Sequence, residues 1–537
     1  MSGLTRRRLL QLAAAVVAAA QPAGEALAAV RRRRRRPRPS FRHGVASGDP
    51  LADRVILWTR VSGVTGPLRV GWIVASDPAL RKVVRRGTAR TGPRRDYTVK
   101  VDATGLQPGR TYHYGFVARG RRSPVGRTRT LPTGAVDSLT LVVATCGDWS
   151  RGLFNSYGRI ADRDDVDAVV HLGDYIYETP KRDDRVRAHD PPVALRRLSD
   201  YRGRYASYRS DPNLQAMHRR HPLIWVWDDH ETVDGTWRGG ADPADHNDAR
   251  DGPFAVRKAA ALQAALEWLP IRSPDRRRPE RIYRDFAFGD LVDLVMLDTR
   301  RIGRDRQGEG NVEAEYFRQT GEFADPDRQI LGAEQEAWLI DRLARSTATW
   351  RLLGNQVVFS PIKVVGAPEA TGMSVYANPD QWDGYAPARR RVLDAMERDG
   401  VQDVVVLTGD VHASMAFEVT EDPNNAAAYD PVSGRGARAV ELVTPSISSA
   451  SDPQEPQDAE GVVERLLLEN AEALRVPNPH MKYAEAVRNG YLLVQVNRER
   501  VRAEYWLVPT VTRPTDEEER SQVFEIARGT PRLAPAD

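Results

Sequence analysis

The fold class is decided by residues 166–178, whose sequence is VDAVVHLGDYIYE. An apolar run of strand length, from Val166 to Gly173, stops on Asp174. After residue 134, several apolar runs like this one alternate with longer polar or helical stretches. This alternation is typical of α/β proteins with a buried sheet. We therefore predict an α/β fold for residues 134–537, with Asp174 at the end of a strand.

Five further apolar runs end on residues that can bind a ligand. They stop at Cys146, Asp228-Asp229, Asp298, Asn355 and Asp410. In open α/β sheets, ligands bind beyond the carboxyl ends of the strands. A single strand-ending aspartate is commonly a cap for the next helix. Six such endings together predict one site built from several strands.

The donor types near these strand ends predict a metal site. Grouped carboxylates repel one another unless cations neutralise them. Carboxylates suit calcium, magnesium or manganese, imidazoles suit zinc or iron, and a thiolate indicates a transition metal. A phenolate favours ferric iron. Two ions that share a carboxylate can clamp both oxygens of a displacement at phosphorus, which predicts phosphate-ester hydrolysis. The candidate donors are Cys146, Asp174, Tyr177, Asp229, His230, Asp410 and His412.

Four motifs, in this order, resemble those of the PhoD-like alkaline phosphatases, a branch of the calcineurin-like metallophosphatases. They are GDYIYE at 173–178, WDDHE at 227–231, GNQ at 354–356 and LTGDVH at 407–412. Flanking stretches agree at 44–50 (GVASGDP), 382–385 (WDGY) and 478–480 (NPH). The resemblance covers nearly all of the mature chain. It implies an αββα metallophosphatase sandwich, in which two facing mixed sheets are flanked by helices, preceded by a small β-sandwich domain.

The resemblance also implies roles for individual residues and names the cofactors as Fe³⁺ and Ca²⁺. Asp174 bridges the two kinds of ion, and His230 is an acid or a phosphate contact. Asp229 and Asp410 are carboxylate ligands. The residues that match the ferric-iron ligands are Cys146, Asp174, Tyr177 and His412.

Four other residues are candidates for supporting roles. Asp234 stands where the family commonly has asparagine, so it is a candidate ligand for a second cation. Arg151 is a candidate phosphate clamp, or a surface arginine in an arginine-rich chain. Asn355 is a candidate substrate contact. His480 either lines the mouth of the site or is a packed or helix-capping residue.

We expect metal-activated hydroxide to attack phosphorus in line while His230 assists the departing alkoxide, with Asp174 essential for turnover. The expected substrates are small phosphate esters, monoesters and also diesters, and the expected oligomeric state is a monomer. One alternative is a phosphodiesterase or phospholipase D-like enzyme on the same cluster. A second alternative is a non-catalytic envelope-binding protein.

Residues 1–29 predict export. The pair Arg6-Arg7 precedes an uncharged apolar run, Leu9 to Ala20, that is too short to span a bilayer. The small residues Ala26-Leu27-Ala28 follow, as a signal peptidase requires. This order predicts a twin-arginine signal peptide, the twin-arginine translocase as a partner, and a periplasmic, secreted or envelope-associated protein.

The formal charge of +6 is concentrated in the N-terminal tail. Residues 1–38 contain ten arginines and one glutamate, so the rest of the chain has a formal charge of −3. A primary nucleic-acid partner is therefore not expected. The linker at 30–40, with Arg31 to Arg36, is either a solvated spacer or a tether to anionic envelope.

Residues 41–133 predict a small immunoglobulin- or fibronectin-like β-sandwich. Short alternating runs cover 54–60, 68–74 and 111–117, separated by turn signals such as Gln107-Pro108-Gly109. Residues 106–112 resemble a tyrosine corner. No chemistry is expected from this domain. Cys146 is the only cysteine, so no intrachain disulfide can form.

Overall fold

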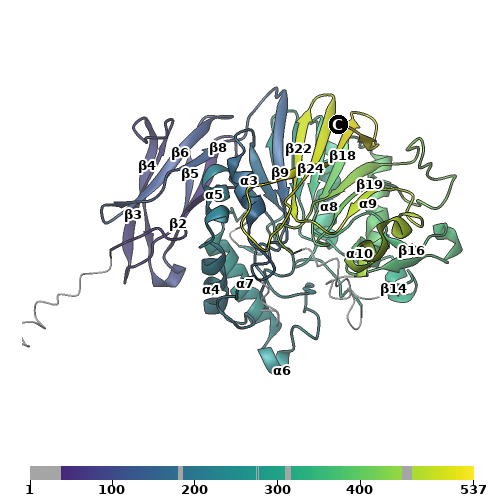
Figure 1. Ribbon diagram of the computed structural model, residues 1–537, viewed down its shortest axis with the longest axis horizontal. Coiled ribbons are helices and arrows are strands. Elements are labelled where there is room, and N and C mark those ends of the chain that lie inside the picture. Colours follow the sequence, from purple (N-terminus) through teal and green to yellow (C-terminus); the bar gives the residue numbers. More distant parts are fainter. Residues whose placement is uncertain (1–37, 180–185, 274, 276, 309–315, 450–461) are drawn as a thin grey trace, which may run out of the picture.

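The computed structural model describes residues 38–179, 186–273, 275, 277–308, 316–449 and 462–537 (Figure 1). The predicted signal peptide at 1–29 and all but the last three residues of the 30–40 linker lie outside these ranges. Within the described ranges, no helix is long and apolar enough to cross a membrane.

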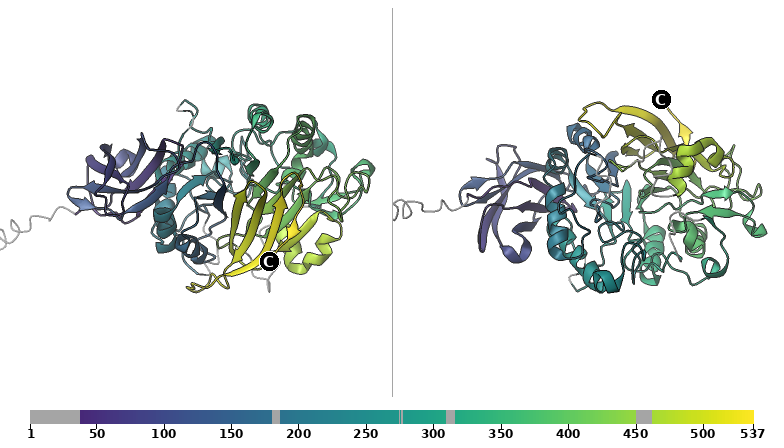
Figure 2. Two further views of the ribbon diagram at one scale, coloured as in Figure 1. Left: turned by 90° about the horizontal axis from the view of Figure 1, so that it is seen from above. Right: turned by 60° about the horizontal axis from the view of Figure 1, so that its bottom comes forward.

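Two large mixed sheets form the centre of the molecule (Figures 1 and 2). The ten-stranded sheet has the order β25(Ala534–Pro535), β24(Glu519–Ala527), β23(Arg500–Leu507), β22(Gly490–Asn497), β9(Ser138–Ala144), β10(Ala168–His171), β11(Pro222–Trp225), β1(Val45–Gly48), β2(Arg54–Arg60), β5(Thr98–Thr104). The seven-stranded sheet has the order β12(Arg284–Phe288), β13(Val292–Met296), β15(Trp350–Gly354), β18(Val404–Thr408), β20(Ala439–Val443), β19(Ser414–Val419), β21(Met481–Glu485).

Helices flank the sheets, and smaller elements complete the chain. The helices are α3(Asn155–Asp162), α4(Leu198–Tyr208), α5(Pro212–Arg220), α6(Asp248–Asp251), α7(Phe254–Trp268), α8(Ala333–Arg345), α9(Ala386–Arg398) and α10(Val462–Arg475). Short 3₁₀ turns are η1(Pro93–Arg95), η3(Gly321–Ala324), η4(Glu369–Thr371) and η5(Trp382–Tyr385). A three-stranded sheet has the order β14(Tyr316–Phe317), β17(Val375–Ala377), β16(Lys363–Val365).

Alternating side chains on the seven-stranded sheet show the layer order. Leu294, Leu352 and Val405 belong to the largest hydrophobic cluster, together with residues of β9, β10 and β11. Their chain neighbours Val295, Leu353 and Val406 belong to a second cluster with residues of α8 and α9. Successive residues of a strand point to opposite faces. One face therefore packs on the ten-stranded sheet and the other on helices, which confirms the predicted αββα fold.

All six apolar runs singled out in the sequence contain a strand, and these strands form two parallel sets. β9, β10 and β11 are parallel neighbours in the ten-stranded sheet. β13, β15 and β18 are parallel neighbours in the seven-stranded sheet. Because parallel neighbours end at the same edge, each sheet brings three strand ends together.

The N-terminal segment is a β-sandwich, as predicted. Its outer sheet has the order β4(Val83–Thr91), β3(Leu68–Ala75), β6(Thr111–Ala118), β7(Arg121–Arg122), and β8(Gly126–Arg129) also pairs with β6. The backbone N–H of Gln107 donates to the Tyr112 hydroxyl at 2.9 Å. This bond to a backbone group a few residues upstream is the contact that defines a tyrosine corner.

The sandwich is less separate from the rest of the chain than the predicted boundaries, 41–133 and 134–537, imply. Its inner strands β1, β2 and β5 belong to the ten-stranded sheet, and β1 pairs in parallel with β11 through Ser47–Pro222 and Gly48–Leu223. The Asp49 carboxylate also binds Arg284 at 2.6 Å. The GVASGDP stretch therefore forms the junction between the two regions, where a Cβ on Gly48 would lie 2.5 Å from the Leu223 carbonyl.

Candidate metal centre

Tight turns follow the strands at the site and hold its side chains in a rarely used backbone conformation. Cys146, Asp174, Asp410 and His412 have φ angles of 54°, 54°, 70° and 52°. Such left-handed conformations cost energy for residues with a side chain, and in folded proteins they gather at functional sites. Gly173 (φ 114°) must be glycine, because a Cβ there would lie 2.4 Å from the Asp228 backbone nitrogen.

Four buried side chains form what we call the thiolate group: Cys146, Asp174, Tyr177 and His412. Ligand atoms of Cys146, Asp174 and His412 lie within 4.8 Å of one another. The Tyr177 hydroxyl lies 3.3 Å from Asp174 Oδ2 and 3.0 Å from His412 Nε2. These are the residues that the resemblance implied as iron ligands, and the structure brings all four together.

Three aspartates form what we call the carboxylate group: Asp228, Asp229 and Asp410. Their oxygens also lie within 4.8 Å of one another. The fully buried Arg300 guanidinium donates to Asp228 and, at 2.6 Å, to Asp410 Oδ1, and it lies 3.6 Å from Asp229. An internal cation therefore already offsets part of this negative charge.

Asp174, Asp229 and His230 link the two groups, with ligand atoms again within 4.8 Å. The His230 ring stacks on Tyr177 with centroids 4.1 Å apart, and its Nδ1 lies 2.8 Å from Glu178 Oε2. Burial disfavours the charged imidazole, but the carboxylates of Asp174 and Glu178 outweigh it and raise the pKa of His230. The same ion pair outweighs burial at Glu178 and lowers its pKa to about 2.

The chemistry of these donors fits bound metal ions. Burial, reinforced by nearby carboxylates, raises the pKa of Cys146 and of Asp174 well above their usual values. Asp174 Oδ1 and Asp228 Oδ2 are buried and accept no hydrogen bond. Buried carboxylate oxygens without partners are costly, and a cation removes both the cost and the competing protons.

Asp234 lies beside this centre but outside its three groups of close ligand atoms. Its backbone N–H donates to Glu178 Oε1 at 3.0 Å. Burial, with the neighbouring Asp229 and Asp245 carboxylates, raises the pKa of Asp234 to about 8 against the opposing charge of His230. Asp234 is therefore a neighbour of the His230–Glu178 pair.

Arg151 lies at the edge of the thiolate group. Its Nε is 3.8 Å from Asp148 Oδ2, and a terminal nitrogen is 3.5 Å from the Ser449 carbonyl oxygen. The Ser449 hydroxyl in turn donates to the Tyr177 hydroxyl at 3.0 Å. The Arg151 side chain is 16% exposed. It is therefore not a plain surface arginine, and it remains a candidate for contact with substrate.

Asn355 is in contact with other parts of the fold. Its amide nitrogen donates to the Val357 carbonyl and the Thr408 hydroxyl, and its oxygen accepts from Trp382 Nε1 at 3.1 Å. The residue is fully buried, and both ends of its amide have protein partners. These contacts indicate a structural role in place of the predicted substrate contact.

His480 is packed in the interior, which corrects the prediction that it contacts substrate at the mouth of the site. Its ring lies 5.4 Å from that of Phe417, and Nε2 lies 3.0 Å from the Pro361 carbonyl oxygen. The side chain is fully buried, and burial lowers the pKa of His480 to about 3. The packed alternative describes it, because a neutral buried imidazole with one backbone partner is a core residue.

Sequence reasoning missed the residues that hold the ligands in place. The Glu231 carboxylate accepts from the backbone N–H groups of Asp174, Tyr175 and Asp228, at 3.1, 2.7 and 2.8 Å. It thereby ties the end of β10 to the end of β11. Arg300 could have been noticed because it follows the strand-ending Asp298. Gln381, which donates to Asp410 Oδ2 at 2.7 Å, gave no signal beyond its place before the WDGY stretch.

The two facing sheets and the strand-end cluster of carboxylates, imidazoles, thiol and phenol define the class of the protein as a metallophosphatase. Models of the PhoD-like phosphatase family match residues 141–505, and a model of that family's N-terminal domain matches residues 25–132. The chain therefore belongs to the PhoD-like phosphatase family, and the prediction of an enzyme of that family is confirmed.

Individual relatives agree with the family models. The chain is 36% identical to alkaline phosphatase D of Bacillus subtilis (strain 168) over 498 residues, which are 88% of this chain and 78% of that protein. It is 33% identical to the solved structure of PhoD, with a TM-score of 0.81 and coverage of 94% of this chain and 92% of that one. The alternative of a non-catalytic binding protein is therefore not carried further.

Proposed function

We propose that the chain is an exported, metal-dependent alkaline phosphatase that uses Fe³⁺ and Ca²⁺ to hydrolyse phosphate esters. The observation that carries the proposal is the convergence of the thiolate and carboxylate groups around Asp174, whose Oδ1 is buried and accepts no hydrogen bond. Asp174 belongs to two of the three groups of close ligand atoms, as a ligand shared by two ions would.

The donor sets support different metals at the two ends of the site. A thiolate, an imidazole and a phenolate around one carboxylate suit a transition metal, and the phenolate favours Fe³⁺. The carboxylate group offers only hard oxygen ligands, which suit Ca²⁺. Cys146, Asp174, Tyr177 and His412 would hold the iron, and Asp174, Asp229 and Asp410 would hold calcium.

When bound, the ions would supply Lewis-acid stabilisation of the phosphate oxygens and of the attacking hydroxide. The chain itself supplies the proton. Glu178 holds His230 through Nδ1, and stacking on Tyr177 fixes the plane of the ring. His230 is thus oriented to donate a proton from Nε2 to the departing alkoxide. The charged imidazole is favoured by the carboxylates around it.

Phosphate monoesters and diesters are both proposed substrates, because the metal groups contain nothing that distinguishes a bridging ester oxygen from a terminal one. A phosphodiesterase or phospholipase D-like enzyme is the second candidate, since the same cluster would serve it. Hydrolysis rates on an aryl phosphate and on the matching aryl phosphodiester separate the two. A much higher kcat/KM on the diester would favour the second candidate.

The experiment that tests the metal assignment is elemental analysis of protein purified after native export, combined with an assay of phosphate release. One iron per chain, together with calcium, is the expected content. Zinc or manganese alone would refute the assignment and indicate another metallophosphatase branch.

Export through the twin-arginine pathway is proposed from Arg6-Arg7 and the apolar run that follows. Replacement of both arginines by lysine should leave the protein inside the cell, as cell fractionation would show. Electrostatic association of Arg31 to Arg36 with an anionic envelope is proposed too. It predicts release by salt and by deletion of these six residues. A monomer is the proposed oligomeric state, which size-exclusion chromatography with light scattering would check.

A further inference from the structure

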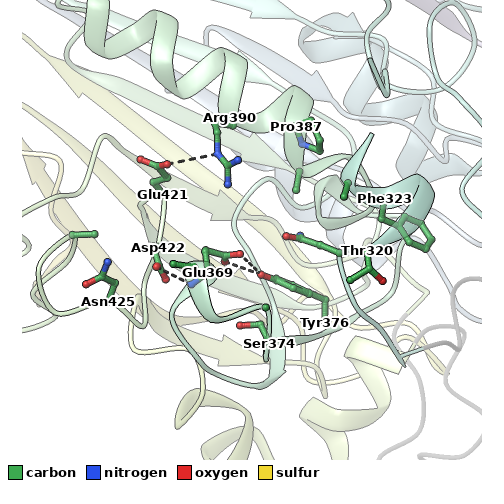
Figure 3. A pocket seen from close by; sticks show the side chains of 16 residues that line it. Thr320, Phe323, Glu369, Ser374, Tyr376, Pro387, Arg390, Glu421, Asp422 and Asn425 are labelled. Carbon is green, nitrogen blue, oxygen red and sulfur yellow. Dashed lines mark hydrogen bonds and ion pairs between the residues drawn. The ribbon is translucent and has the colours of Figure 1, made fainter. Parts of the chain in front are cut away.

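A pocket of about 540 Å³ lies between the three-stranded sheet and the start of α9 (Figure 3). Its walls come from η3, η4, β17, the first turn of α9 and the segment after β19. None of its lining residues belongs to the metal centre. Its volume lies within the range of about 300–1,000 Å³ that is usual for small-molecule sites.

Two of the three carboxylates that line the pocket already have a cation. Glu369 accepts from the buried Lys363 ammonium at 2.8 Å and from the Tyr376 hydroxyl at 2.7 Å. Glu421, on the exposed rim, lies 3.6 Å from Arg390 Nε. Figure 3 shows both carboxylates beside their partners on the wall of the pocket.

Asp422 is the most buried of the three and lacks such a partner. It is 6% exposed, and Oδ2 accepts from the Glu369 backbone N–H at 2.9 Å. Oδ1 accepts no hydrogen bond, and the Lys363 ammonium is 3.9 Å away, too far for one. A buried carboxylate oxygen without a donor is costly. The pocket therefore has an acceptor that a ligand can satisfy.

The charges around the pocket limit what that ligand can be. Three carboxylates and two cations leave a formal charge of −1, which disfavours anions. Within the described chain, the groups of carboxylate, imidazole and thiol atoms close enough to share a metal ion are those of the strand-end site, not these carboxylates. An organic cation with one N–H donor for Asp422 matches both the charge and the unused acceptor.

We propose that this pocket binds an organic monocation, whose ammonium group donates a hydrogen bond to Asp422 Oδ1 and neutralises the remaining charge. Phe323 and Tyr376 supply the apolar contact for the carbon skeleton of the ligand. The site is separate from the phosphate-ester site, and the proposal holds whatever metals the chain uses.

A titration with matched probes tests the charge of the ligand. Ethanolamine and ethylene glycol differ by an ammonium group in place of a hydroxyl. Ligand-observed NMR on the metal-loaded full chain should show saturable binding of ethanolamine and much weaker binding of ethylene glycol. Equal binding of the two, or no binding of ethanolamine, would overturn the proposal.

Two substitutions with opposite expected signs locate the site. Asp422→Asn keeps an acceptor for the Glu369 N–H and removes the charge, so it should weaken ethanolamine binding about tenfold or more, as loss of a charge-assisted hydrogen bond does. Arg390→Ala removes an exposed cation from the rim and should tighten binding by about two- to fivefold.

Asp399→Asn, at the far end of α9, is the matched control and should leave binding unchanged. Thermal unfolding of each variant checks that it is folded, and Arg390→Ala carries the test if Asp422→Asn is not. Loss of hydrolysis has no bearing on this result, because binding is measured directly. Ethanolamine binding that neither pocket substitution alters would place the ligand elsewhere and refute the proposal.

Discussion

The thiolate group and the carboxylate group lie side by side at the ends of two sheets, but the chain treats their charge differently. Within the described residues, the contacts of Cys146 and Tyr177 are with one another's neighbours, and no arginine or lysine forms an ion pair with Asp174. The carboxylate group, by contrast, is built around Arg300.

This difference predicts different roles for the two ions. An ion in the thiolate group supplies all of the local positive charge and gains a soft donor that calcium does not favour. An ion in the carboxylate group competes with a guanidinium for the same oxygens, since Arg300 donates to Asp410 Oδ1 at 2.6 Å. We expect a tightly held ion in the first group and an exchangeable one in the second.

Asp174→Asn should have the largest effect, because this residue belongs to both sides of the comparison. Loss of the shared carboxylate should lower kcat more than about a thousandfold, since the several kcal/mol supplied by the ions is lost. Steady-state hydrolysis of an aryl phosphate measures it. Asp165→Asn, an exposed aspartate before the same strand, is the control. Undiminished turnover by folded Asp174→Asn would remove the proposed mechanism.

Cys146→Ser should break the thiolate group alone. A hydroxyl is a poor substitute for a thiolate toward a transition metal, so iron per chain should fall sharply in elemental analysis. Activity should fall about a hundredfold, as expected for an impaired metal site. Calcium bound by the same sample is the internal control. Full iron content in the variant would mean that the thiol is not a ligand.

Treatment with a calcium chelator such as EGTA should break the carboxylate group alone. Activity should fall more than about tenfold and return on addition of calcium, because the oxygen ligands remain in place. Iron content, measured in parallel, should not change. Loss of iron before calcium would reverse the comparison between the two groups.

Gln381→Met removes the amide that donates to Asp410 Oδ2 while keeping the length of the side chain. Its effect should be confined to the carboxylate group, with calcium affinity weakened about tenfold, as is usual when a ligand loses its orienting partner. Calcium titration of activity and thermal unfolding of the same sample separate this effect from loss of structure. An unchanged calcium dependence would argue against a role for Gln381.

Asp234→Asn should have the smallest effect of the five. Asp234 lies outside the groups of close ligand atoms, so calcium content should be unchanged and kcat should fall less than about tenfold through the neighbouring His230–Glu178 pair. Loss of one calcium per chain would instead identify Asp234 as a ligand of a second cation.

The ligands could be identified from the sequence because each follows an apolar run, and strand ends in parallel sheets meet at one edge. Cys146, Asp174, Asp229 and Asp410 all come together in the structure as expected. The residues that orient them could not be identified in this way. Glu231 acts through backbone N–H groups on two loops, and Gln381 reaches Asp410 from a different segment of the chain.

The same reasoning explains the residues whose roles were misjudged. Asn355 follows a strand as Asp174 does, but its amide is used by Val357, Thr408 and Trp382. His480 belongs to a motif shared with the family, but its ring packs on Phe417. Position after a strand, or within a motif, does not state which way a side chain points. Only the packing around it does.

The sequence by itself determined the order of strands and loops, the donor types and the family, because hydrophobic periodicity and motif spacing are local properties of the chain. The tertiary structure decided how the negative charge is balanced. It places Arg300 among Asp228, Asp229 and Asp410, and it leaves Asp174 Oδ1 without a donor. Charge balance in a buried site depends on distances between residues far apart in the sequence, and those distances exist only in the folded chain.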